Sequence, residues 1–192
     1  MFMALKGRSN VALALMALMV FALACKFGDQ TGEANKLVDK ANDEIKAAKD
    51  IQQKNEVKIT DYKEALNKGD FKEAKAILDG VVVDIDKGVK HGDTAAENLE
   101  SAAKLKVDDK FKEYLDVRAK SVRKRIDSYK ELQNMFKITG DMLANPTSTT
   151  VSQAQPKIKD SQSKIAKLDK EADDLEEKSE KVRKDNPDKF KG

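Results

Sequence analysis

Apolar residues recur at steps of three and four positions through most of this 192-residue chain, and this spacing constrains the fold more than any other feature. In an α-helix such residues share one face, which is buried against a neighbouring helix. The charged residues between them, 37% of the chain, suit the solvated faces of long helices. The sequence predicts an all-α protein whose helices cover about residues 32–68, 70–105, 108–143 and 153–185.

Residues that end and begin helices lie between these apolar stripes. Gly69 suits the position that follows a helix C-terminus, and Asp70 can accept hydrogen bonds from the free N–H groups of the next helix. Asp108 or Asp109 can cap the third helix in the same way. We therefore expect tight turns between the first three helices.

The last helix follows a different kind of connection. Residues 147–155 are rich in Ser and Thr, which predicts a linker. Pro156 then fits the first turn of a helix, where its missing N–H costs little. Asn186-Pro187 ends this helix, and the charged residues 187–192 are expected to form a frayed tail.

The lengths of the predicted helices favour a particular arrangement. Each segment of about 35 residues would be about 50–55 Å long. Short turns make consecutive helices antiparallel, so an up-down-up-down four-helix bundle over residues 32–186 is the favoured fold. A heptad pattern over residues 158–182 also fits a coiled coil. An extended helical hairpin that completes its core by forming an oligomer is the alternative.

Gly88 and Gly92 lie near the middle of the second predicted helix. The apolar register continues through both glycines, which favours one unbroken helix over a break at this point. When the helices fold back on each other, this stretch faces Ala48 of the first helix and lies level with Ile126 of the third. Close packing of large side chains against small ones is the favoured interpretation. A small apolar pocket or a hinge is the alternative.

The N-terminus has the composition of an export signal. Lys6 and Arg8 precede an apolar run, residues 11–24, that contains no charged residue. About fourteen helical residues span about 21 Å, which is short for a retained transmembrane anchor. Small residues around Leu23 precede Cys25, the only cysteine, so a signal peptidase is expected to cut just before Cys25.

The four residues that end at Cys25, Ala-Leu-Ala-Cys, resemble the lipobox of bacterial lipoproteins, and the resemblance covers residues 1–25 only. It implies a signal peptide over 1–24, a diacylglycerol and acyl chains such as palmitate on Cys25, and a short tether over 25–31. In a Gram-negative envelope, Lys26 at the next position would favour the outer membrane. The family usually has its Leu one position earlier, so cleavage by ordinary signal peptidase, which leaves the cysteine unmodified, is the alternative.

The composition limits the available chemistry. Lys6 and Arg8 are two of the 37 basic residues, which leaves 35 against 34 acidic residues after the signal. A nearly neutral exported chain gives no reason to expect nucleic acid as a partner. With His91 as the only histidine and Cys25 as the only cysteine, the usual zinc, di-iron and haem ligand sets cannot be assembled. We expect no metal, no cofactor and no catalytic residue, and hence a protein that is not an enzyme.

A run of basic residues in the third predicted helix is the candidate for contact with an anionic surface. Its members could meet lipid head groups or an acidic envelope polymer. Asp116 and Asp127 dilute the charge, so a solvated helix face is the favoured interpretation. The basic run comprises Arg118, Lys120, Arg123, Lys124 and Arg125.

Together these features predict a non-enzymatic lipoprotein of the cell envelope, held at a membrane by its N-terminal lipid. The bundle would act as a scaffold, adaptor or binding module for an envelope protein or a cell-wall partner, and oligomer formation is left open. One alternative is a periplasmic carrier or chaperone that binds an apolar ligand or client in the Gly88–Gly92 region. Another is a surface-exposed adhesin or host-interacting lipoprotein.

Overall fold

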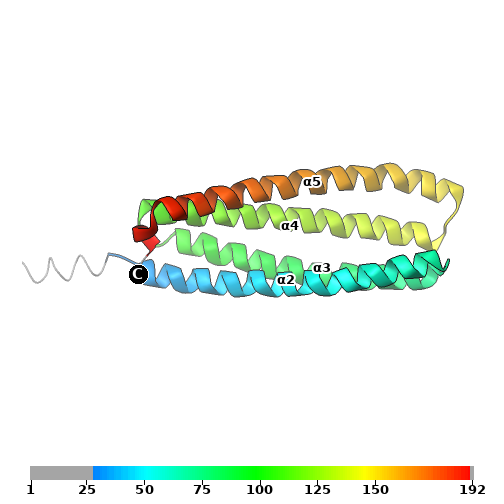
Figure 1. Ribbon diagram of the computed structural model, residues 1–192, viewed down its shortest axis with the longest axis horizontal. Coiled ribbons are helices and arrows are strands. Elements are labelled where there is room, and N and C mark those ends of the chain that lie inside the picture. Colours follow the sequence, from blue (N-terminus) through cyan, green and yellow to red (C-terminus); the bar gives the residue numbers. More distant parts are fainter. Residues whose placement is uncertain (1–27, 191–192) are drawn as a thin grey trace, which may run out of the picture.

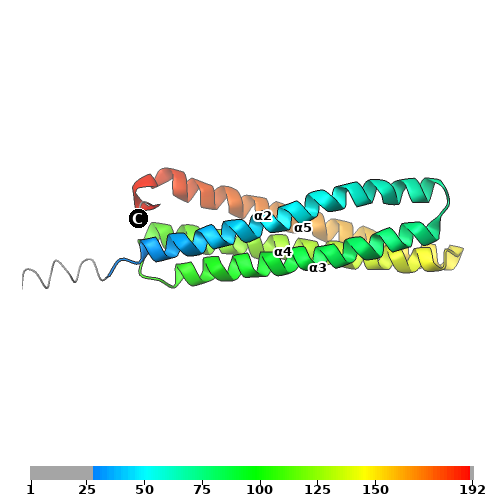
Figure 2. The ribbon, with the colours of Figure 1, turned by 90° about the horizontal axis from the view of Figure 1, so that it is seen from below.

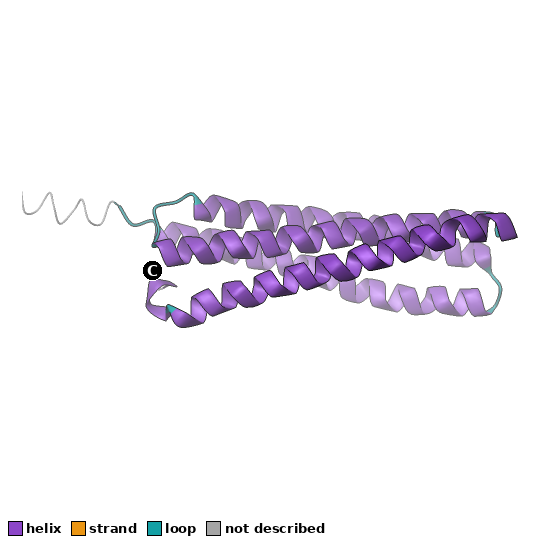
Figure 3. Ribbon diagram, turned by 90° about the horizontal axis from the view of Figure 1, so that it is seen from above, coloured by secondary structure: helices purple, strands orange, loops and turns teal. Residues whose placement is uncertain are grey.

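The computed structural model describes residues 28–190, and almost all of their backbone is helical (Figure 3). Helix α2 covers Thr31–Asn67, α3 covers Phe71–Ala103, α4 covers Asp109–Ala144 and α5 covers Ser148–Asp185. A short 3₁₀ helix, η1, follows at Pro187–Phe190. The predicted all-α fold is confirmed. The predicted signal peptide and Cys25 lie outside the described residues.

The four long helices form one antiparallel bundle (Figure 1). α2 packs on α3, α3 on α4, and α4 on α5. α2 and α3 lie in one layer and α4 and α5 in the other, and no comparable interface joins α5 to α2 within the described residues. In the view from below, α2 and α5 cross in projection (Figure 2). One chain supplies all four helices, so the alternative of an extended hairpin is wrong.

The turns form as the capping residues predict. Gly69 has a φ of 73°, a conformation that favours glycine, and it directly follows the last turn of α2. The side chain of Asp70 accepts a hydrogen bond of 2.9 Å from the backbone N–H of Glu73 in the first turn of α3. Asp108 caps α4 by accepting from the N–H of Lys110 at 2.8 Å. These short connections hold α2, α3 and α4 side by side.

The predicted linker before the last helix is wrong, because α5 begins at Ser148 instead of near residue 153. Thr147 and Thr150 form a capping box, in which each side chain bonds to the backbone N–H of the other. Ala154 within this stretch is buried, so packing supports the early start as well. Pro156 consequently lies in the interior of the helix and not in its first turn. Because proline has no N–H, one helical hydrogen bond is not formed at this position.

Helix α3 is continuous through Gly88 and Gly92, as the unbroken apolar register predicts. At Gly92 the predicted close packing is confirmed: a Cβ atom there would lie 2.8 Å from Cγ1 of Ile126 on α4. Gly88 differs, because its Cβ would meet only Cγ2 of Ile51 on α2, at 3.9 Å. Gly92 therefore allows α3 and α4 to pack closely, whereas space remains beside Gly88.

The C-terminal tail is ordered through residue 190, so the expectation of a frayed tail is wrong for the described part of it. The ring of Phe190 lies 5.1 Å from that of Phe111 and 5.2 Å from that of Tyr114, measured between centroids. Lys189 Nζ also lies 3.4 Å from a carboxylate oxygen of Asp108. Burial of an aromatic ring outweighs the charge of this short segment.

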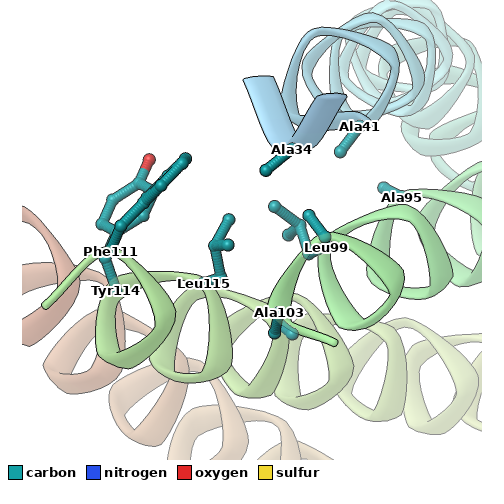
Figure 4. Packing of buried hydrophobic residues seen from close by; sticks show 10 residues of the cluster. Ala34, Ala41, Ala95, Leu99, Ala103, Phe111, Tyr114 and Leu115 are labelled. Carbon is teal, nitrogen blue, oxygen red and sulfur yellow. The ribbon is translucent and has the colours of Figure 1, made fainter. Parts of the chain in front are cut away.

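Phe111 and Tyr114 belong to a buried cluster at the end of the bundle where the described chain begins and ends (Figure 4). Ala34 and Ala41 of α2 face Leu99 of α3 there, and Leu115 of α4 points toward the same space (Figure 4). The other two clusters lie near the middle and the far end of the bundle. They are built from residues of α2, α3 and α4 only.

Helix α5 is attached to the bundle in another way. Its buried residues are all small: Ala154, Ser161, Ala172 and Ser179. The Ser121 hydroxyl on α4 donates a buried hydrogen bond of 2.8 Å to the carbonyl oxygen of Ala172. α5 therefore lies close along α4 but contributes little large apolar surface to the core, which α2, α3 and α4 must enclose.

Candidate functional site

The basic run on α4 is largely occupied by carboxylates of the same chain. Arg123 binds Glu100 at 3.0 Å and Asp93 at 2.7 Å, both on α3. Its hydrogen bond to Glu100 raises the pKa of Arg123 and lowers that of Glu100 below the ordinary value of 4.5. The charge of this arginine is thus already matched within the bundle.

The other arginines and one lysine of the run hold α5 against α4. Arg125 binds Asp169 at 3.0 Å and Asp173 at 2.5 Å, and Lys124 binds Glu171 at 2.7 Å. The hydrogen bond to Glu171 raises the pKa of Lys124. Together with Arg118, whose contacts are described next, four of the five residues of the basic run form contacts within the bundle.

Arg118 connects three helices near the end of the bundle that carries the termini. It donates to the Tyr114 hydroxyl at 2.8 Å, to Asn42 of α2 at 2.9 Å and to Glu180 of α5 at 3.4 Å. Lys120 is exposed and, among the described residues, has no carboxylate within ion-pair distance. The basic run therefore acts mainly as a set of interhelical ties, and an anionic surface would have to compete with them.

A cavity of 380 Å³ lies between α2, α3 and α4 at the middle of the bundle. Its wall is mostly aliphatic and aromatic, and the polar side chains that reach it come mainly from α2. Gly88 opens part of this wall, because only Ile51 approaches the position that a side chain there would take. The apolar wall residues are Ala48, Ile51, Ile59, Val81, Ile85, Leu132 and Phe136.

Asn55 is the buried polar residue of this wall, with 8% of its surface exposed. Its side-chain oxygen Oδ1 is shielded from solvent and has no hydrogen-bond partner among the described residues. An unpaired buried amide oxygen costs about 1–3 kcal/mol, so side chains of this kind are normally paired. Asn55 Oδ1 is therefore the one buried polar atom of this wall that has no hydrogen-bond partner among the described residues.

A second space of 500 Å³ adjoins the first and extends toward α5. The two share five lining residues, Ala48, Gln52, Gly88, Tyr129 and Leu132. The Tyr129 hydroxyl donates to the Gln52 side-chain oxygen at 2.7 Å, which joins α4 to α2 at the boundary between them. Burial raises the pKa of Tyr129 above 10.0, so the hydroxyl keeps its proton.

The second space is more polar than the first. Arg118, Arg125 and Asp169 line it, and each is held by the ion pairs described above. Ile165 of α5 also lines it and is only half-buried. The space is thus a groove that residues of all four helices line, and α2 and α5 have no extensive interface with each other within the described residues.

Other candidate chemistry is limited in the part of the chain that the structure describes. His91 Nδ1 lies 2.5 Å from Glu44 Oε2, which ties α3 to α2. No group of three or more potential metal ligands comes together within residues 28–190. No helix in that range has both the length and the apolar character that a membrane crossing requires.

The sequence pointed to part of this site. The Gly88–Gly92 stretch and Ala48 were expected to lie together, and both Gly88 and Ala48 line the cavity. Sequence reasoning gave Asn55 no role. The available signal was the presence of two amides, Gln52 and Asn55, at successive positions of the apolar stripe of α2. Comparison of the chain with protein-family models, with curated proteins and with solved structures finds no match, so the function has to be argued from this geometry.

Proposed function

We propose that this protein is a non-enzymatic, membrane-tethered binding protein that holds an apolar ligand in the cavity between α2, α3 and α4. The observation that carries the proposal is the 380 Å³ apolar cavity itself. The space is a half-open groove and not an enclosed void, because Gln52, Glu56, Thr60 and Lys63 of its lining are exposed. At about 30 Å³ for a water-sized group, this cavity corresponds to about a dozen such groups, which is the lower range of ligand sites.

The pairing of the basic run supports a binding role for the cavity over one for the charged surface. Arg123 and Arg125 contact carboxylates of α3 and α5, so these groups already have partners. The cavity wall, in contrast, is mostly aliphatic and aromatic. The carrier hypothesis therefore has stronger geometric support than the scaffold hypothesis, and nothing in the described residues favours an adhesin.

The start of the bundle adds support for a position close to a membrane. The backbone of Gln30 donates to the carbonyl oxygen of Lys106 at 2.8 Å, and its side chain accepts from the N–H of Lys106 at 2.9 Å. With Gln30 fixed in this way, five residue steps separate it from Cys25, which is at most about 18 Å. A lipid on Cys25 would thus keep this end of the bundle near the bilayer.

The helix geometry also fixes the distance between the cavity and the end of the bundle that carries the tether. Gly88 lies fifteen positions before Ala103, the last residue of α3, and Ala103 is at the end of the bundle that carries Gln30. At 1.5 Å per residue, the cavity is about 22 Å from that end. An apolar molecule taken from the bilayer would travel this distance plus at most the length of the tether, about 40 Å in all, which suits a carrier or a holding protein.

Binding can be tested with pyrene, which is apolar and has no hydrogen-bond donor. The chain from residue 25, with Cys25→Ser, should enhance pyrene emission and shift its vibronic bands toward an apolar environment. Gly88→Leu should weaken this binding at least tenfold, because the new side chain enters a space that only Ile51 borders. Gly80→Leu on the same helix is the matched control, since nothing lies within 4 Å of its position and it does not line the cavity.

Two results would contradict the proposal. Wild-type protein that does not bind pyrene would make the scaffold or adaptor hypothesis the better explanation. Equal weakening by Gly80→Leu and Gly88→Leu would show that the effect comes from the helix and not from the cavity. The tether is tested separately by mass spectrometry of the native N-terminus and by envelope cross-linking of wild type and Cys25→Ser, where an unmodified cysteine and unchanged neighbours would rule it out.

A further inference from the structure

The two spaces at the middle of the bundle differ in polarity and follow each other along its axis. Aliphatic and aromatic side chains line most of the first, whereas charged side chains of α2, α4 and α5 line the second. On α4 the first space extends to Phe136 and the second to Arg118, and eighteen residue steps place these positions about 27 Å apart. A ligand that occupies both spaces would therefore be long, with an apolar part and a polar part.

The boundary between the two spaces is apolar on its inner side and polar on its outer side. Ala48, Gly88 and Leu132 belong to both linings, and Gly88 is buried. The hydrogen bond of 2.7 Å from Tyr129 to Gln52 lies on the solvent side, because Gln52 is exposed. With no side chain at position 88, the inner side of this bond suits the passage of an alkyl chain from one space to the other.

Two charged residues of the second space have no ionic partner in the part of the chain that the structure describes. Arg118 and Arg125 already contact carboxylates of α5. Lys49 of α2 and Glu176 of α5 also line this space, and neither has an opposite charge within ion-pair distance among residues 28–190. The space thus offers one positive and one negative group to a ligand.

These two groups lie at similar heights along the bundle. Asn42 and Glu180 both contact Arg118, which places them at one level. Lys49 is seven positions after Asn42 and Glu176 is four positions before Glu180, so they lie about 10 Å and 6 Å beyond that level, on the same side of it. The axial difference of about 4 Å is close to the separation of phosphorus and nitrogen in phosphocholine, where four bonds advance about 1.3 Å each.

We infer that the ligand is a single-chain zwitterionic amphiphile. Its alkyl chain lies in the cavity between α2, α3 and α4, and its phosphate and ammonium groups meet Lys49 and Glu176 in the second space. This inference rests on the proposed binding function. A purely anionic head group would be repelled by Glu176 and a purely cationic one by Lys49, whereas a zwitterion pairs with both.

The first space sets the length and number of the chains. A volume of 380 Å³ holds about a dozen groups of about 30 Å³, which corresponds to one chain of about twelve carbon atoms. On α2, the eleven residue steps from Gln52 to Lys63 cover about 16 Å. Twelve carbon atoms in an extended chain, at about 1.3 Å each, cover about 15 Å. Dodecylphosphocholine therefore has the chain length and the head group that this site requires.

Displacement of bound pyrene by dodecylphosphocholine, kept below the concentration at which it forms micelles, measures its affinity. The protein is again the chain from residue 25 with Cys25→Ser, and each value is referred to the pyrene affinity of the same variant. Lys49→Gln combined with Glu176→Gln should weaken binding about 2- to 25-fold, as expected for the loss of two exposed charge contacts, and 1 M salt should abolish the difference. Lys46→Gln combined with Glu177→Gln is the matched control, because both residues are exposed and line neither space.

The orientation of the ligand can be read independently by nuclear magnetic resonance. A nitroxide on the last carbon atom of the dodecyl chain broadens the amide signals of nearby residues. Val81 and Phe136 line only the first space, and Ser121 and Val122 line only the second. The signals of Val81 and Phe136 should broaden more strongly, because the chain end lies in the apolar space.

The outcomes separate this inference from the function on which it rests. Dodecylphosphocholine that does not displace pyrene, or an equal loss of affinity in the two double variants, would overturn the inference and leave the apolar site standing. Stronger broadening at Ser121 and Val122 would place the chain end in the polar space and also overturn it. Failure to bind pyrene would overturn the proposed function itself.

Discussion

The three glycines of α3 allow the packing beside the cavity to be measured by one small perturbation, Gly→Ala. A Cβ atom at Gly80 would meet nothing within 4 Å, and at Gly88 it would meet only Ile51, at 3.9 Å. At Gly92 it would lie 2.8 Å from Cγ1 and 3.3 Å from Cδ1 of Ile126. Ile126 is 2% exposed, so it has little room to move away.

The expected free energies of unfolding follow from two opposing effects. Replacement of a helical glycine by alanine stabilises a helix by about 0.8–1 kcal/mol, and this gain should appear in full for Gly80→Ala and Gly88→Ala. A methyl group forced into a filled site costs about 1–3 kcal/mol. Gly92→Ala should therefore be about 1–3 kcal/mol less stable than Gly80→Ala, and equal to or less stable than the wild type.

Urea unfolding followed by far-ultraviolet circular dichroism measures these differences, with similar m-values as the condition for comparing midpoints. A gain for Gly92→Ala as large as that for Gly80→Ala would refute the close approach of α3 and α4 at Ile126. A loss for Gly88→Ala comparable to that for Gly92→Ala would refute the space beside Gly88, and with it the cavity wall.

The remaining predictions concern the ties between helices. The hydrogen bond from Arg123 lowers the folded-state pKa of Glu100 below 4.5, so the stabilisation that it adds is present above pH 4.5 and is lost as pH falls through the lower folded value. Glu100→Gln should lower the free energy of unfolding by at most about 1 kcal/mol at pH 7, because the pair is partly exposed. It should also reduce the loss of stability at acidic pH, measured as the urea midpoint against pH. An unchanged loss at acidic pH would contradict the pairing. Phe190→Ala should cost about 1–2 kcal/mol, less than the 3–5 kcal/mol typical of a fully buried ring, because Phe190 is only half-buried against Phe111 and Tyr114. The urea midpoint measures this loss too, and no loss would mean that the tail is frayed after all.

The helices themselves could be predicted because their signals are local. Apolar spacing defines each stripe, and the turn at Gly69 and the caps at Asp70 and Asp108 depend on residues within one helical turn of each other. Continuity of α3 through its glycines was also visible, since the register of apolar residues does not shift there. Such features need no knowledge of the neighbouring helices.

The errors arose where tertiary contacts outweighed local composition. The stretch before Pro156 is poor in large apolar residues, yet a capping box and the burial of Ala154 make it helical. The charged tail is held by one ring, Phe190, whose partners on α4 are about 80 positions away in the sequence. The basic run was expected to be a solvated helix face, with contact to an anionic surface as the alternative, but its arginines contact carboxylates of α3 and α5.

By itself, the sequence determined that this chain forms four long helices, the first three joined by tight turns, because periodicity and capping act over a few residues. Only the tertiary structure decided where these helices leave space. Beside Gly88 there is no side chain to fill the space between α3 and α2, whereas at Gly92 Ile126 of α4 lies directly against α3. In addition, α5 packs on α4 and has no extensive interface with α2 within the described residues. Packing distances of this kind depend on all the side chains at an interface together, so no single stripe encodes them.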